Sequence, residues 1–428
     1  MPPVLIGSGP CALRAAAAIP EVQWLDASPF VVDHPHLPVD MGVFEDHGTA
    51  EIVRELAGGA PQVTLRSEML AKGRRLELPF RRRELARMLP LQGAQRALTD
   101  WTKTRANIRA REVIGGGHEQ RSYQDWVVYR YGRALYEQLH APYAQRRFGE
   151  PEQVAIALAK IHHGVIESPG WARFGQSASA AHQGLLSHTQ RDSADMEGVE
   201  LKDGKVCAVF TDQGRVETER LFWAGPVPEL AEWLEGEIPE ILAVDMRRLK
   251  TRHRIEAFLP MPGADLLPEV LHIVDKAPFF RVTPVSMQDD GKIDGVCCHI
   301  ALDDGAPEWG MGDARLLVQC AEALTLLEIG RADESKGLLR RMADYDPAWQ
   351  VGRWFPDATR VTRAMHEMGI SLVGRSAAYR WMDPGQALRL GRSIGQEPDA
   401  WHEALRTQVD PPIRLADEGV PVTRFVER

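Results

Sequence analysis

The sequence contains no apolar run of about 18 residues, the length that a membrane-spanning helix needs. Its N-terminus also lacks the basic segment and cleavage site of a signal peptide. Basic residues are in the minority, and the formal net charge is −9. A general nucleic-acid binder needs a basic face to displace counterions. We therefore expect a cytoplasmic protein with no membrane span and no nucleic-acid partner.

Cysteine is scarce and scattered, with five residues at Cys11, Cys207, Cys297, Cys298 and Cys320. The count is odd, and the spacing fits neither a disulfide framework nor a Cys/His metal site. Cys297 and Cys298 are adjacent in an expected strand, so their side chains should point to opposite faces. Buried thiols are favoured over a redox pair, and no metal site is predicted.

The first 26 residues have the pattern of a parallel βαβ unit. An apolar strand at 3–6 leads into a glycine turn, a small-residue helix at 11–19 and a second strand at 22–25. Asp26 closes that strand. This order is typical of a nucleotide-binding Rossmann unit.

The turn Gly7-x-Gly9-x-x-Ala12 carries the first chemical signal. Gly7 permits a tight turn, Gly9 lets backbone approach a pyrophosphate, and Ala12 allows close packing of helix on strand. With Pro10, these residues open a helix whose N–H groups favour phosphate, and Asp26 suits a ribose hydroxyl. The pattern predicts a dinucleotide site; a Rossmann turn that binds nothing is the alternative.

The remaining chain mixes helices and strands, and its length of 428 residues suggests two or three domains. Ser122 and Asp125 form an expected capping box for a helix through Tyr136. Asp383 and Pro384 suit the start of a late helix. The other expected segments are a strand at 74–80, largely helical residues at 81–145, strands at 205–211, 215–223, 271–274, 279–283 and 295–302, a helical stretch at 312–346 and a strand at 371–373.

Three further segments carry a family resemblance. They read SYQDWVVYRYGRALY at 122–136 with PYAQRRFG at 142–149, APFFRVT at 277–283, and ISLVGRSAAYRWMDPGQALRLG at 370–391. With the N-terminal turn, they resemble the flavin-dependent amine-oxidase/desaturase superfamily. The subgroup they are most similar to includes protoporphyrinogen-oxidase-like and UDP-galactopyranose-mutase-like proteins. The last segment is the most specific.

The resemblance implies an α/β protein with a discontinuous Rossmann-like FAD-binding domain, a mixed-sheet substrate domain and a helical cap. The FAD-binding parts would be residues 1–73, 196–245 and 355–428. Residues 74–195 and 246–354 would form the substrate domain.

The resemblance also assigns roles to residues. Gly374 and Arg375 would lie at the flavin pyrophosphate, and Gly42 belongs to a segment similar to a cofactor-side strand. Helix-end N–H groups stabilise an anionic reduced flavin. The residues expected to face the ring from such a helix end are Met382, Asp383, Gln386 and Ala387. Arg281 and Phe279 would contact substrate.

The implied activity is that of an FAD-dependent oxidoreductase. It would oxidise a C–H or C–N bond of a small organic substrate by hydride transfer to flavin N5, and no catalytic base is assigned. A protein partner or a homodimer remains open.

The sequence also departs from the family pattern. No glycine pair follows Asp26, and Ala377 replaces the second glycine of the closing motif. One alternative is therefore a degenerate flavin-fold pseudoenzyme that acts as an accessory or binding subunit. A second is a sugar-nucleotide mutase that uses reduced flavin. It would need an arginine-rich pocket, for which Arg81–Arg83 and Arg281 are the candidates.

Overall fold

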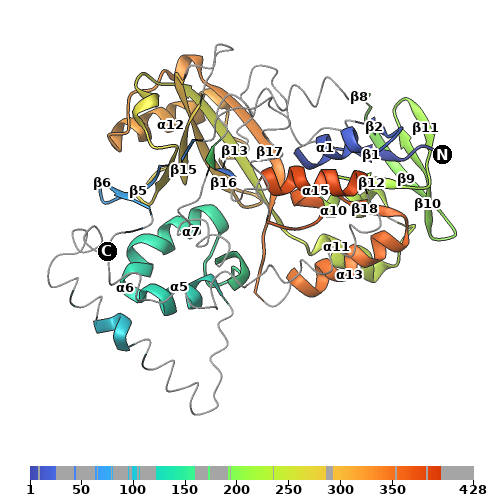
Figure 1. Cartoon of the computed structure of the whole chain (residues 1–428), viewed down its shortest axis with the longest axis horizontal. Coiled ribbons are helices and arrows are strands. Elements are labelled where there is room, and N and C mark those ends of the chain that lie inside the picture. Colours follow the sequence, from blue (N-terminus) through green and yellow to red (C-terminus); the bar gives the residue numbers. More distant parts are fainter. Residues whose placement is uncertain are drawn as a thin grey trace.

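The computed structural model describes most of the chain in segments. These are residues 1–7, 10–25, 43–44, 63–64, 66–78, 80, 95, 99–103, 106, 122–159, 172–173, 191–192, 194–234, 236–285, 293–351, 354–381 and 384–396. No described helix has the length and apolar character needed to cross a membrane. Two large sheets organise the described residues (Figure 1).

The first sheet is parallel throughout and includes the predicted N-terminal unit. Its strand order is β18 (Ile370–Leu372), β12 (Leu221–Trp223), β1 (Val4–Ile6), β2 (Gln23–Leu25) and β8 (Arg191–Asp192). The neighbouring strands β12 and β1 are fully buried, which explains their continuous apolar sequences. Helix α1 (Pro10–Ala18) connects β1 to β2, as predicted for a βαβ unit.

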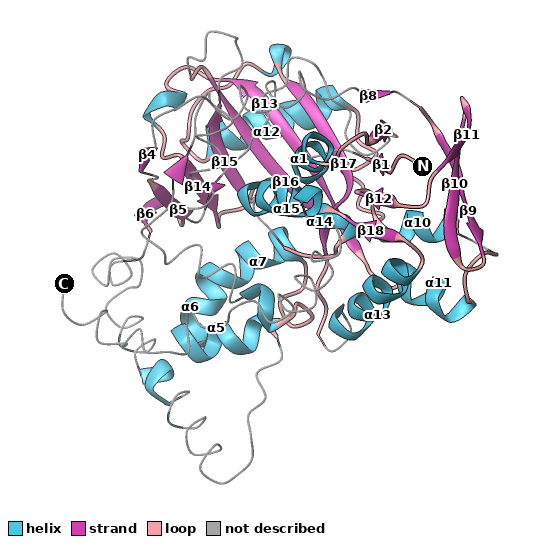
Figure 2. Ribbon diagram, turned by 45° about the vertical axis from the view of Figure 1, so that its right-hand side comes forward, coloured by secondary structure: helices cyan, strands magenta, loops and turns pink. Residues whose placement is uncertain are grey.

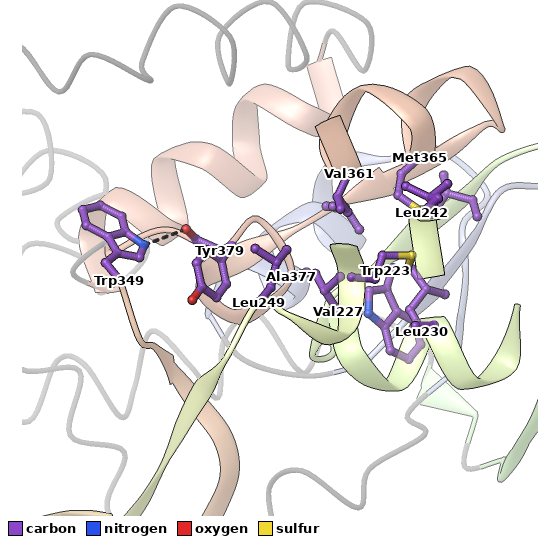
Figure 3. Close-up of a cluster of buried hydrophobic side chains, with 14 of the residues drawn as sticks. Trp223, Val227, Leu230, Leu242, Leu249, Trp349, Val361, Met365, Ala377 and Tyr379 are labelled. Carbon is purple, nitrogen blue, oxygen red and sulfur yellow. Dashed lines mark hydrogen bonds between the residues drawn. The ribbon is translucent and has the colours of Figure 1, made fainter. Parts of the chain in front are cut away.

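Helices cover both faces of this sheet. Helix α15 (Pro384–Gln396) lies beside α1 (Figures 1 and 2). The other face packs against α10 (Val227–Trp233), α11 (Glu240–Arg247) and α13 (Trp354–Glu367). Figure 3 shows part of that core, in which Trp223 and Leu230 lie near Val361 and Met365.

A small antiparallel sheet precedes β12. It consists of β9 (Met196–Lys202), β10 (Lys205–Thr211) and β11 (Gly214–Glu217). The single strand predicted at 215–223 is therefore wrong, because β11 ends at Glu217 and β12 joins the parallel sheet. Thr218 lies between the two strands, and its hydroxyl donates a 3.0 Å hydrogen bond to Pro2 O, just before β1.

The second large sheet is mixed and has seven strands. Their order is β17 (Leu338–Pro347), β13 (Thr251–Pro260), β16 (Gly295–Leu302), β15 (Arg281–Val285), β14 (Val270–Ile273), β5 (Ser67–Ala71) and β6 (Arg74–Glu77). Helix α12 (Asp313–Leu326) covers one face by packing Leu316 and Leu324 on Ile255 and Leu259. Short 3-10 turns, η2 (Ala264–Leu266) and η3 (Glu334–Lys336), connect its parts. A separate sheet has the order β3 (Val43–Phe44), β7 (Ala172–Arg173) and β4 (Val63–Thr64).

The helical stretch predicted at 312–346 is only partly right. Helix α12 ends at Leu326, and residues 338–347 form β17 against β13. The helix stops just before Glu328, whose φ of +54° is a left-handed conformation that an α-helix does not continue through. Pairing with β13 then determines the conformation of residues 338–347.

The predicted capping box at Ser122 is confirmed. The Ser122 hydroxyl accepts from Asp125 N, and Ser122 N–H donates to Asp125 Oδ2, both at 3.1 Å. The helix does not run unbroken to Tyr136, because Gly132 has φ +83° and touches Trp101. The block consists of α5 (Tyr123–Tyr131), α6 (Arg133–Leu135), a π-helical turn η1 (Tyr136–His140) and α7 (Ala141–Phe148).

Candidate functional site

The strand order of the parallel sheet reverses between β1 and β12. From β1 the chain moves through α1 to β2 on one side, while β12 lies on the other side. Ligands of open α/β sheets bind outside the carboxyl ends of the strands at such a switch point. Gly7 follows β1 there, and Ala224 and Gly225 follow β12. Gly7, the first residue of the predicted phosphate turn, therefore lies at the expected crevice.

Gly7 has a conformation and surroundings that require glycine. Its φ is +103°, and a Cβ would lie 3.2 Å from both Ala224 C and Ala224 Cβ. The indole of Trp24, on β2, donates a 2.8 Å hydrogen bond to Gly7 O. These contacts fix the start of the turn from both neighbouring strands.

Two motif segments that are distant in sequence meet at the first turn of α1, which begins at Pro10. Gly374, at the start of α14 (Gly374–Ala377), has φ +88°, and its Cβ would lie 3.5 Å from Cys11 Cβ. Gly391 of α15 packs against the backbone of Cys11 and Ala15. Cys11 and Ala12 are buried, and burial raises the pKa of the Cys11 thiol. The structure thus brings together the turn, the closing glycine and the last helix.

Not every cofactor residue predicted from the sequence can be compared with this geometry. Gln386 and the buried Ala387 lie near the start of α15. The predicted residues Gly9, Asp26, Gly42, Met382 and Asp383 lie outside the described residues, as does the basic run Arg81–Arg83.

The closing motif is anchored to the seven-stranded sheet. Tyr379 follows α14 with φ +51°, and its hydroxyl lies 2.7 Å from Lys250 O. Trp349 Nε1 donates to Tyr379 O at 3.0 Å (Figure 3). Ala377, in the position of the missing glycine, is fully buried within the same apolar core.

A row of polar side chains crosses the seven-stranded sheet on the face opposite α12. The strand registers place Arg340, Glu256, His299, Arg281 and His272 directly opposite one another in turn. Arg340 Nε donates to Glu256 Oε2 at 3.0 Å, and Glu256 Oε1 lies 3.4 Å from His299 Nδ1. Arg281 Nη2 lies 3.3 Å from the His299 ring. Arg281 therefore belongs to a buried ionic network.

Phe279 has a different location from that expected for a substrate-binding residue. It is fully buried in the apolar core beneath α12, together with Leu271 and Val282. The adjacent Phe280 packs instead against Tyr143 and contacts Arg281 on the polar side.

Arginines from four elements gather around Phe280, Tyr345 and Trp381. They are Arg147 on α7, Arg254 on β13, Arg281 on β15 and Arg375 on α14. We call these four residues the arginine cluster. Of these four, only Arg281 and Arg375 have a role predicted from the sequence. Arg147 lies within the family-like segment at 142–149, which indicates no role for it.

Asp346 on β17 joins the arginine cluster. Its two oxygens lie 2.6 Å from Arg254 Nη2 and 2.6 Å from Arg375 Nη1. Burial alone would raise the pKa of Asp346, but Arg254 and Arg375 outweigh burial and lower the pKa to about 2. Arg375 is thus held by a carboxylate of the other sheet, and the pair links the two halves of the molecule.

Tyr143 and His272 connect α7 to the polar row. The Tyr143 hydroxyl lies 2.8 Å from His272 Nδ1. Burial, together with Arg281 and Arg147, lowers the pKa of His272 to about 3. His272 is therefore neutral at ordinary pH and hydrogen-bonds to Tyr143 without adding charge.

Within the described residues, no group of His, Cys, Asp and Glu side chains is arranged to hold a metal. Cys297 and Cys298 face opposite sides of β16, as predicted, and belong to different apolar clusters. All five cysteines are free thiols.

No protein-family model matches this chain, and no curated protein matches it. Solved structures do match. A reduced UDP-galactopyranose mutase has a TM-score of 0.69 and 13% identity, covering 94% of this chain and 98% of that one. A protein assigned as a protoporphyrinogen oxidase from Exiguobacterium sp. 255-15 has a TM-score of 0.65 and 13% identity, with 93% and 98% covered. A putrescine oxidase with redesigned cofactor binding has a TM-score of 0.55 and 13% identity, with 93% and 99% covered.

The chain therefore shares the fold of these solved structures, two of which are of the kinds that its sequence motifs resemble. The α/β fold class with a Rossmann-like unit is confirmed.

Proposed function

We propose that the chain binds FAD, with the pyrophosphate at the switch point between β1 and β12. The observation that carries the proposal is the convergence of Gly7, Gly374 and the first turn of α1. Two glycines with positive φ and a helix N-terminus form a backbone surface suited to phosphate. The described residues therefore fit the cofactor that the fold implies.

The domain division predicted from the sequence remains a prediction, and strand pairing would move β5 and β8 across its boundaries. Residues of the parallel sheet, with α1, α13 and α15, would form the FAD-binding domain, and the seven-stranded sheet with α12 the substrate domain. β5 would then belong with the substrate domain, since it pairs with β14. A protein partner or homodimer remains a prediction.

The proposed reaction is the oxidation of a C–H or C–N bond in a small organic substrate. Bound FAD would supply the electron acceptor for that step. The polar row and the arginine cluster would bind and orient the substrate. The neutral His272, with the Tyr143 hydroxyl, provides a hydrogen-bonding pair that is buried from solvent.

FAD retention by a Gly9→Val variant tests the proposal. A valine side chain in the phosphate turn should block approach of the pyrophosphate, so the variant should fold but lose flavin. Gly310→Val is the matched control, because no atom lies within 4 Å of a Cβ there. A Gly9→Val protein with full flavin occupancy would show that the phosphate turn is assigned wrongly.

A second candidate is a sugar-nucleotide mutase that uses reduced flavin. The arginine cluster favours it, because several guanidinium groups could bind a diphosphate. Titration of the reduced protein with UDP-galactose tests this candidate. Absence of binding would exclude it without affecting the oxidoreductase proposal.

A further inference from the structure

Arg147, on the last turn of α7, is a cation with unused hydrogen-bond donors. Its Nε and Nη1 atoms are buried and have no acceptor in the part of the chain that the structure describes. The residue as a whole remains partly exposed. Burial, reinforced by Arg254 and Arg281, lowers the pKa of Arg147 to about 10, so it stays charged at neutral pH. Buried donors of a charged group without acceptors are rare and call for an explanation.

Aromatic rings surround this guanidinium. Its Cζ lies 4.6 Å from the centroid of Phe280, 5.1 Å from that of Phe148 and 5.4 Å from that of Trp381. Ring faces offset part of the cost of a buried cation. They provide no oxygen acceptor for Nε or Nη1, so the rings orient the group without satisfying its donors.

The nearby carboxylates are already engaged. Asp346 divides its two oxygens between Arg254 and Arg375. Glu256 pairs with Arg340 and lies against His299. Arg254 is itself buried and has an Nε without an acceptor among the described residues. The arginine cluster therefore has more positive charge and more donors than the described acids can match.

We propose that Arg147 and Arg254 form a binding site for an oxyanion group of the substrate, a carboxylate or a phosphate. Guanidinium groups match the oxygen geometry of such anions and bind them through paired, charge-assisted hydrogen bonds. The inference rests on the proposed function in one respect: it names the substrate class for the same site. The substrate would thus be an organic acid or a phosphate ester.

Calorimetric titration of the full-length protein tests this site. The probes are inorganic phosphate and succinate, which distinguish a phosphate site from a carboxylate site. We expect one of them to bind, and Arg147→Met to weaken that binding about tenfold or more, the effect of losing a charge-assisted hydrogen bond. Arg248→Met is the matched control, since the Arg248 side chain is 62% exposed and its ion pair is with Asp245, which lies outside the cluster. It should leave the affinity unchanged.

Thermal unfolding without anion gives a second readout. If Arg147 is present to bind a ligand, replacing it with methionine removes an uncompensated charge and should raise the midpoint. If the arginine is structural and held by the three rings, the same change should lower it. A lowered midpoint together with unchanged anion affinity would overturn the inference, as would absence of binding to both probes by the wild-type protein.

Flavin retention, measured in parallel, separates this inference from the proposed function. Arg147→Met should retain flavin while losing anion affinity. If flavin is lost to the same extent, the anion belongs to the cofactor and the substrate assignment is overturned. If the wild-type protein binds no flavin but binds the anion through Arg147, the oxidoreductase proposal fails and the anion site stands.

Discussion

Asp346 holds two guanidinium groups of the arginine cluster together and is only 1% exposed. Asp346→Asn leaves Arg254 and Arg375 with a neutral partner. We expect a loss of about 3–5 kcal/mol in the free energy of unfolding, the usual effect of breaking a buried ion pair. Chemical denaturation at neutral pH measures it. A loss below about 1 kcal/mol would contradict the assigned pairing.

The same carboxylate gives a pH signature. Its pKa is lowered from 3.8 to about 2 in the folded protein, so its stabilising effect is present above pH 3.8 and is lost as pH falls toward 2. The contribution is roughly 2 kcal/mol. The wild-type protein should show this loss in acid denaturation curves, and the Asn variant should lack it.

At the residue scale, sequence spacing could identify positions that require a particular backbone conformation or a close approach of the backbone. Gly7 and Ala12 could be placed in this way because strand–turn–helix order restricts where a small residue is needed, whereas Gly374 was placed by family resemblance. The location of Phe279 could not be predicted from the sequence. Whether Phe279 or Phe280 faces the polar side of the sheet depends on where β15 begins. A role for Arg147 could not be predicted, because the lack of acceptors for its donors among the described residues results from tertiary packing.

At the scale of elements, α1 and α15 pack at backbone distance through Gly391. A Cβ at this position would lie 2.9 Å from Ala15 N and closer still to Cys11 O. Gly391→Ala should therefore separate the helices and cost about 1–3 kcal/mol, outweighing any gain in helix propensity. Gly310→Ala, in open space, is the control. Thermal unfolding measures both, and equal midpoints would contradict the close packing.

Elements with local signals could be predicted, and elements determined by distant partners could not. The capping box at Ser122 and the strands β1, β2 and β18 have their determinants in a few adjacent residues. β17 was expected to be helical because its apolar residues fit a helical period, whereas pairing with β13 decides its conformation. The break at Gly132 depends on contact with Trp101, which lies 31 residues earlier (132 − 101).

For the whole molecule, two buried histidines predict sensitivity to acid. Burial lowers the pKa of His140 and His272 from 6.5 to about 3. The unfolded chain takes up protons below pH 6.5 while the folded chain does not, so stability should fall as pH drops from 6.5 toward 3. The loss is on the order of a few kcal/mol per histidine.

Denaturation across this pH range, with a His140→Phe variant, measures the effect. Phenylalanine keeps a ring against Tyr131, whose ring lies 4.8 Å from that of His140, and removes the titrating group. The pH dependence should become shallower. The exposed His366→Phe is the control, and an equally steep curve in both variants would exclude His140 as a source of the acid sensitivity.

The overall architecture could be predicted because the motif segments occur in the family order along the whole chain. Their meeting around α1 is a property of the fold, and it places Gly374 and Gly391 against the helix that follows Gly7, although they are distant from it in sequence. The arginine cluster, which lies between the two sheets, required the structure.

The visible absorption spectrum of the purified protein, before and after incubation with FAD and removal of unbound cofactor, tests the central claim most directly. We predict the absorption bands of a protein-bound oxidised flavin, either at once or after incubation. A protein that remains colourless, with an unfolding midpoint unchanged by FAD, would contradict flavin binding and favour a cofactor-free member of this fold.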